Sequence, residues 1–94
     1  MNPSAAELAA DVIQWVAERM LVQLRDELTA FGVNAELRDN NSALMVARLR
    51  PGLPVRVIVE YDGLYYSWHD AKKRHPTNDP RGAASILAEY VKGR

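Results

Sequence analysis

A long helical repeat at the start of the chain constrains its fold more than any other feature. Apolar residues recur at steps of three and four over the first third of the sequence, and Gly32 then supplies the left-handed residue that commonly follows a helix end. Ser4 and Glu7 have capping-box spacing at the beginning of this repeat. The pattern predicts a helix over residues 5–31 with a length of ~40 Å, whereas a strand of about six residues spans only ~20 Å.

Four short apolar-rich segments follow this helix, and each has the length and the boundaries of a β-strand. Asp62-Gly63 separates two of them and is the strongest signature of a two-residue hairpin, because both central residues of a type I′ turn need positive φ. The other two flank the turn residues Asp39–Ser42. The pattern predicts an antiparallel meander of four strands at residues 33–38, 43–49, 55–61 and 64–68.

The last predicted element is a second helix with a clear start. Asp79 can cap it and Pro80 fits its first position, which predicts a helix over residues 80–92. Lys72 to Pro76 is then interpreted as the crossover from the last strand to this cap. We expect one domain, 1–94, of the α+β class, with a two-layer αββββα fold and both helices on one face of the sheet.

The expected hairpin registers decide which strand side chains face the helices. In the second hairpin, Val59 lies opposite Tyr66 and Val57 lies opposite Trp68. These four residues share the face that the helices cover. The other face is semi-apolar and forms either a wet surface or half of an interface. Its members include Met45, Ile58, Tyr65, Ser67 and His69.

The charges and residue types exclude several classes of function. The 12 acidic and 12 basic side chains cancel, so no overall field attracts nucleic acid or an anionic membrane. The apolar runs fall short of the ~20 residues of a membrane span. The lack of Cys removes disulfides, thiolate nucleophiles and zinc fingers. We expect a cytoplasmic protein with no membrane partner.

Catalytic and cofactor-binding patterns are also missing from the sequence. It has no nucleophile beside a base, no clustered carboxylate pair and no Gly-rich phosphate loop. His69 and His75 lie near Asp70 and Asp79, but this spacing is a weak metal-ligand pattern. We therefore expect a protein that is not an enzyme and that has no cofactor and no metal site.

A second apolar row on the long helix indicates a contact surface. Leu8, Trp15 and Val22 lie seven residues apart, well round from the main apolar stripe. Either the helix bends or breaks and packs this row under the C-terminal helix, or the row binds a partner, because an exposed Trp is a typical anchor. We expect a protein–protein interaction or chaperone-like accessory module that forms a homodimer or binds another protein. Its expected partner-binding residues are Leu8, Trp15, Val22, Met45, Ile58 and Tyr65.

A basic run before the second helix supports an alternative function. Lys72, Lys73 and Arg74 precede a helix N-terminus, and the expected hairpin brings Arg56 near them. The αβββα core with basic residues before its last helix is similar to the double-stranded-RNA-binding domain. The alternative is therefore an accessory protein that binds nucleic acid weakly, although three adjacent charges are also typical of a solvated loop.

The C-terminal third carries a further resemblance. An aromatic strand is followed by His75-Pro76, Asp79-Pro80, Ala83-Ala84 and Leu87-Ala88-x-Tyr90. This order resembles small uncharacterised accessory proteins of high-GC Gram-positive bacteria, which implies a bacterial, cytoplasmic accessory role. The layout also resembles small dimeric secretion-chaperone-like domains, which use a long helix, a twisted sheet and dimerisation to hold a partner segment.

Overall fold

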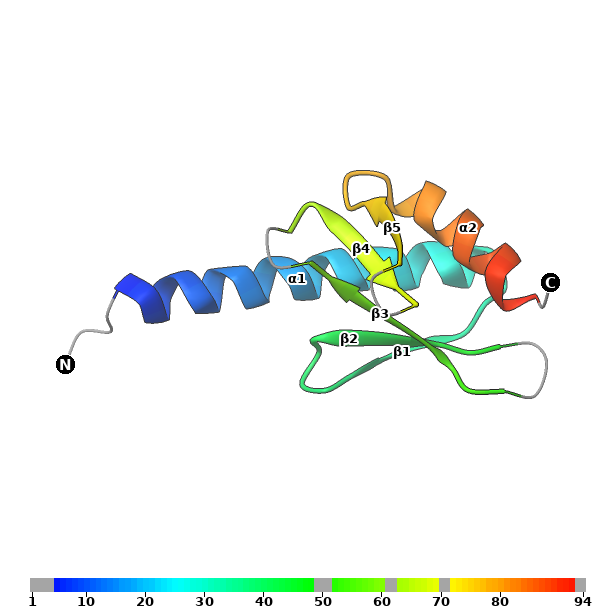
Figure 1. Ribbon diagram of the computed structural model, residues 1–94, viewed down its shortest axis with the longest axis horizontal. Helices are drawn as coiled ribbons and strands as arrows, with labels where there is room; N and C mark the ends of the chain where they lie inside the picture. The colour runs from blue at the N-terminus through cyan, green and yellow to red at the C-terminus, as the bar shows by residue number, and fades with distance from the viewer. Residues whose placement is uncertain (1–4, 49–51, 61–62, 70–71, 93–94) are drawn as a thin grey trace.

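The computed structural model describes residues 5–48, 52–60, 63–69 and 72–92, with side chains of the first helix from Trp15 onward. Figure 1 shows a long helix, an antiparallel sheet and a C-terminal helix, which confirms the α+β class. The elements of these residues are α1 (Ala5–Ala30), β1 (Ala35–Arg38), β2 (Ala43–Val46), β3 (Val55–Val59), β4 (Tyr65–Trp68), β5 (Lys73–Pro76) and α2 (Pro80–Val91). Ser4 of the predicted capping box and Asp62 of the predicted turn lie outside the described residues.

The sheet has five strands in the order β1-β2-β3-β4-β5, so the prediction of four strands was wrong. The additional strand is β5, which falls in the segment interpreted as a crossover. It pairs with β4, with His75 opposite Tyr66 and Lys73 opposite Trp68. The ladder continues past the strand end, because the Thr77 amide donates to the carbonyl of Leu64 at 2.9 Å. Backbone pairing therefore holds this charged segment at the sheet edge, although the segment has no apolar pattern of its own.

The registers predicted for the first hairpin and for the start of the second are confirmed. Arg38 pairs with Ala43 across the first turn, and Val59 pairs with Tyr66 in the second hairpin. Gly63 has a φ of 75° and its amide donates to the Glu60 carbonyl at 2.8 Å. A residue without a Cβ adopts this positive φ without strain, which explains why the turn has glycine here.

Both helices and alternate strand positions contribute to one apolar core. Its buried members are Leu21, Leu24, Leu28, Val33, Leu44, Val46, Val55, Val57, Tyr66, Trp68, Ala83, Ala84, Leu87, Ala88 and Val91. The strand members are those that the register places on one face of the sheet, so α1 and α2 cover the same face. The predicted inward positions of Tyr66 and Trp68 are confirmed.

The N-terminal half of α1 extends beyond the sheet, as Figure 1 shows. The molecule measures 51 Å along its longest axis and only 24 and 23 Å along the other two. The buried α1 residues begin at Leu21 among the described side chains. The body of the fold thus rests on the C-terminal half of α1, and the N-terminal half is left as a projecting arm.

Tyr66 links the sheet to α1. Its side chain is fully buried and its Oη donates a hydrogen bond to the carbonyl of Met20 at 2.7 Å. Burial raises the pKa of Tyr66 to about 12, from an ordinary value of 10.0. The unfolded chain therefore releases this proton at lower pH than the folded protein does. The stability that follows from this difference is complete below pH 10 and is lost as the pH rises through about 12.

We expect Tyr66→Phe to lower the free energy of unfolding by about 1 kcal/mol at neutral pH, because the Met20 carbonyl loses its donor. The same variant is expected to lose less stability than the parent between neutral and strongly alkaline pH. Urea unfolding at a series of pH values measures both effects. An equal loss of stability at alkaline pH in both proteins would contradict the assignment of this pH dependence to Tyr66.

A polar cluster fixes the start of α2. The Asp79 carboxylate accepts from the Gly82 amide at 3.1 Å, and its other oxygen lies 2.9 Å from Nε2 of His75. The predicted cap at Asp79 and the first-turn position of Pro80 are confirmed. A Cβ on Gly82 would collide with the Asp79 carboxylate and lie 2.9 Å from Nε2 of His75, so the cluster needs glycine at this position.

The hydrogen bond from His75, followed by that from the Gly82 amide, lowers the pKa of Asp79 below its ordinary value of 3.8. The resulting stability is present above this ordinary value and is lost as the pH falls through the lower folded pKa. We expect Asp79→Asn, which keeps an acceptor but not the charge, to lose less stability on acidification than the parent. Thermal unfolding from neutral to strongly acidic pH checks this, with Ser85→Ala on the same helix as the control. An unchanged acid dependence in Asp79→Asn would refute it.

Candidate functional site

The projecting half of α1 carries an exposed aromatic side chain that the sequence predicted to be a contact residue. Trp15 is 57% exposed, and the Arg19 guanidinium lies 5.0 Å from the centre of its ring. A hollow of about 260 Å³ lies beside it, and we name it the helix hollow. Its lining residues are Trp15, Glu18, Arg19, Val22 and Gln23. The structure thus brings Trp15 and Val22 together as predicted, while the side chain of Leu8 is not among those described.

The exposure of Trp15 also decides between the two explanations of the second apolar row of the helix, which consists of Leu8, Trp15 and Val22. α1 is continuous from Ala5 to Ala30, and Trp15 does not belong to the core that α1 forms with α2. The interpretation in which a bent or broken helix buries the row under the C-terminal helix was therefore wrong. Trp15 and Val22 lie on an accessible helix face.

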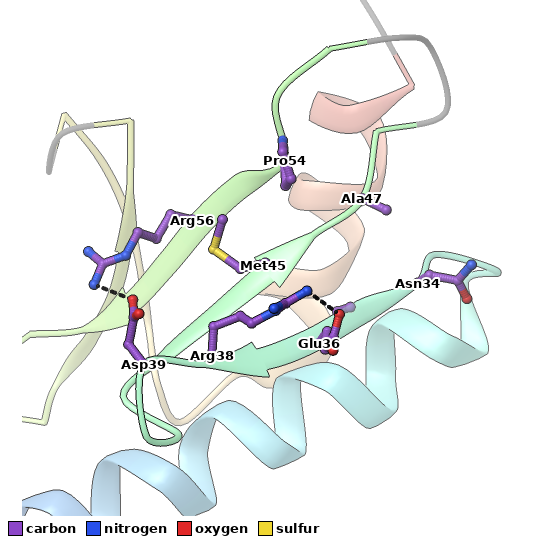
Figure 2. A pocket seen from close by; sticks show the side chains of 9 residues that line it. Asn34, Glu36, Arg38, Asp39, Met45, Ala47, Pro54 and Arg56 are labelled. Carbon is purple, nitrogen blue, oxygen red and sulfur yellow. Dashed lines mark hydrogen bonds and ion pairs between the residues drawn. The ribbon is translucent and has the colours of Figure 1, made fainter.

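A larger hollow lies on the sheet face that the helices leave open, and we name it the sheet hollow. Its volume is about 500 Å³. In Figure 2, the thioether of Met45 lies between two ion pairs. Arg38 is 3.0 Å from Glu36 on one side, and Arg56 is 3.1 Å from Asp39 on the other. The sheet hollow is therefore an apolar floor with a charged but internally neutralised rim.

Two other predicted contact residues lie on the open face outside the sheet hollow. Ile58 is opposite Ser67, and Tyr65 is opposite Pro76 at the β4–β5 edge. The Arg74 guanidinium covers the ring of Tyr65 at 5.2 Å from its centre. Met45, Ile58 and Tyr65 share a face as the register requires, but the described contacts do not bring them into one site.

The residues predicted to bind anions are also dispersed. Arg56 is paired with Asp39, and Arg74 lies 3.5 Å from the Glu60 carboxylate. Lys72 and Lys73 are exposed. Because successive side chains of a strand point to opposite faces, β5 separates Lys73 from Arg74. The run Lys72-Lys73-Arg74 is therefore not a single basic patch.

His69 does not point away from the helices as predicted. Its φ of 57° ends the extended backbone of β4. Its Nδ1 lies 3.3 Å from the Tyr90 hydroxyl of α2, and the two rings meet edge to face at 6.4 Å. The strand period could not predict this, because it applies only while the backbone stays extended.

The charged rim of the sheet hollow was not predicted from the sequence. Arg38, Asp39 and Pro54 line it beside Met45. A signal was available, since the confirmed hairpin register pairs Glu36 with Met45 and so puts the β1 charges beside an apolar floor. The hollow itself depends on how β3 continues the sheet, which turn chemistry alone does not fix.

No protein-family model, curated protein or solved structure matches this chain. Within the described ranges, no three or more histidine, aspartate and glutamate side chains are grouped as a metal site requires. The same residues include no helix that is both long and apolar enough to cross a membrane. The function is therefore inferred from the surfaces described above.

Proposed function

We propose that this protein is a non-catalytic interaction module that self-associates through the projecting half of α1. The observation that carries the proposal is Trp15, which is 57% exposed on a helix face that the core residues of the described chain leave accessible. A large aromatic side chain surrounded by a partner is a typical anchor of a protein interface. A second copy of the chain is the occupant we propose for this face.

The shape of the helix face supports a second copy. An isologous two-fold interface requires each surface to carry both the feature that inserts and the feature that receives it. α1 has both, because Trp15 projects from the helix and the helix hollow of about 260 Å³ lies beside it next to Val22. Two antiparallel copies of α1 can therefore insert the Trp15 ring of each chain beside Val22 of the other.

The charges on this face support the same arrangement. Glu18 and Arg19 are adjacent and both line the helix hollow. An antiparallel pair can place the carboxylate of one copy near the guanidinium of the other, as charged positions flanking a helix seam commonly do. Glu18 also accepts from Asn41 of the first hairpin turn at 3.2 Å, so the body of the fold supports the base of the arm.

Sedimentation equilibrium of the full chain over a wide range of concentrations tests the proposal. We expect a monomer–dimer equilibrium with a dissociation constant in the micromolar to millimolar range, on the order of −4 to −8 kcal/mol. Residues 5–20 carry three acidic side chains and one basic one, so salt should screen residual repulsion and leave the dimer intact or stronger. A monomer at every concentration would refute self-association.

Nucleic-acid binding remains the alternative, and its salt dependence is opposite. Binding to phosphates by Arg56, Lys72, Lys73 and Arg74 would weaken steeply with rising salt because counterions are released. The pairing of Arg56 with Asp39 and of Arg74 with Glu60 does not favour it. A titration with labelled duplex RNA at two salt concentrations separates the two functions, since the dimer should persist where phosphate binding is lost.

We also propose a more specific role for this module, that of a chaperone-like accessory protein. The resemblance of the C-terminal third to small bacterial accessory proteins supports a cytoplasmic accessory role, and the resemblance of the layout to secretion-chaperone-like domains supports a chaperone-like one. A dimer joined through α1 would leave the open sheet face of both copies accessible, together with the sheet hollow around Met45.

A further inference from the structure

A third hollow lies at the end of the β3–β4 pairing, and we name it the strand-end hollow. The register pairs of β3 with β4 are Val59–Tyr66 and Ile58–Ser67, as predicted, and the predicted pair of Val57 with Trp68 is not among them. Beyond Ser67, β3 continues against β2 and β4 continues against β5. The opening has a volume of about 400 Å³.

Two residues that line this hollow each carry a buried polar atom with no hydrogen-bond partner among the described residues. The two atoms are Oγ of Ser67 and Nε1 of Trp68, and the two residues are only 1% and 3% exposed. Ser67 and Trp68 point to opposite faces of β4, yet both line the strand-end hollow, which lies where the β3–β4 register pairs end. A buried donor without a partner costs about 1–3 kcal/mol, so native proteins usually provide such groups with water or a ligand.

The surrounding charges favour an anion. Arg48 and Arg56 line the hollow, and its described lining contains no acidic side chain. Arg48 lies over the ring of Tyr90 at 5.3 Å and donates from Nε to the Leu53 carbonyl at 2.8 Å. This anchoring uses Nε and leaves the two terminal nitrogens of the guanidinium as the end that can bind a planar oxyanion. Because Asp39 is paired with Arg56, Arg48 is the principal cation of the site.

Leu53, Pro54 and Ile58 supply apolar surface to the remaining lining, which also includes His69 and Tyr90. The indole N–H can only donate, and a guanidinium repels cations, so the donors of this hollow suit neither a metal ion nor an ammonium group. A volume of about 400 Å³ is within the usual range for small-molecule sites.

We propose that the strand-end hollow binds a small organic anion. The oxyanion, a carboxylate or a phosphate, accepts from Arg48 and from the buried Ser67 hydroxyl and Trp68 indole. The apolar part of the ligand packs against Leu53, Pro54 and Ile58. This site is separate from the α1 surface and does not depend on self-association.

The test is an NMR titration of the ¹⁵N-labelled full chain with benzoate, phenyl phosphate and the neutral analogue benzyl alcohol. We expect a saturable shift of the Trp68 indole N–H with at least one of the two anions. The indole of Trp15 is the internal control and should not follow it. A response to benzoate alone identifies a carboxylate ligand, and a response to phenyl phosphate alone identifies a phosphate. No shift with either anion, or an equal shift with benzyl alcohol, overturns the proposal.

Two variants locate the binding. Arg48→Gln is expected to weaken the affinity by roughly tenfold or more, because a charge-assisted hydrogen bond is lost. Ser67→Ala is expected to weaken it less and serves as the second variant if Arg48→Gln does not fold. Arg81→Gln is the matched control, since Arg81 is 82% exposed on α2 and does not line the hollow. Parent affinity in both Arg48→Gln and Ser67→Ala, or an equal loss in Arg81→Gln, would overturn the assignment.

Discussion

Replacement of Trp15 by glutamate is expected to raise the dissociation constant of the dimer about 100-fold, which corresponds to about 2.7 kcal/mol. The change removes the ring that each copy would insert beside Val22 in the proposed dimer, and it places a carboxylate close to Glu18. Because Trp15 is 57% exposed in the single chain, the body of the fold should be unaffected. Sedimentation equilibrium measures the constant, and urea unfolding at low concentration checks the fold.

Ile86→Glu is the matched control for this experiment. Ile86 is also an exposed apolar side chain, but it lies on α2 rather than on the projecting half of α1. We expect this variant to associate like the parent. The proposal fails if Trp15→Glu associates as tightly as the parent, or if Ile86→Glu dissociates to the same extent.

Leu24→Ala is expected to lower the free energy of unfolding by about 3 kcal/mol, because a large buried side chain is replaced and a cavity remains. Leu24 is fully buried in the half of α1 that packs on the sheet and α2. Urea unfolding gives the change directly. Asp26→Ala, two residues along the same helix with a side chain that is 69% exposed, is expected to change stability by less than about 0.5 kcal/mol.

The comparison between these two positions separates packing from helix propensity. Alanine favours a helix at both sites, so propensity alone would stabilise both variants. A loss in Leu24→Ala similar to that in Asp26→Ala would mean that the C-terminal half of α1 does not support the core. It would also remove the distinction between the packed and projecting halves of α1.

The first hairpin and most of the core could be predicted because two independent signals agree there. Turn residues fix where each pairing begins, and the period of two then assigns every side chain to a face. Leu44, Val46 and Tyr66 are buried on the predicted face for this reason. The fifth strand could not be found in the same way, since Lys73 and Arg74 are both exposed and show no apolar alternation. Its position depends on backbone hydrogen bonds to β4, which leave no pattern in the side chains.

The candidate surfaces, like the fold, could be predicted only in part. Helical spacing brought Trp15 and Val22 together, and the structure places both beside the helix hollow. The strand-end hollow was not predictable, because the expected register continued the second hairpin to Trp68. The hollow lies where the β3–β4 register pairs end, and its lining includes residues from β3, β4 and α2, so it depends on the packing of the whole sheet.

The charged edge at β5 sets a limit on assembly. A strand edge that accepts another strand can add copies without end, whereas a two-fold helix contact is complete with two copies. Lys73 and Arg74 lie on the β5 edge, and lysine at such positions discourages strand addition. Growth by strand addition at β5 is thus disfavoured, and pairing through the α1 arm would give a closed pair rather than a growing fibre.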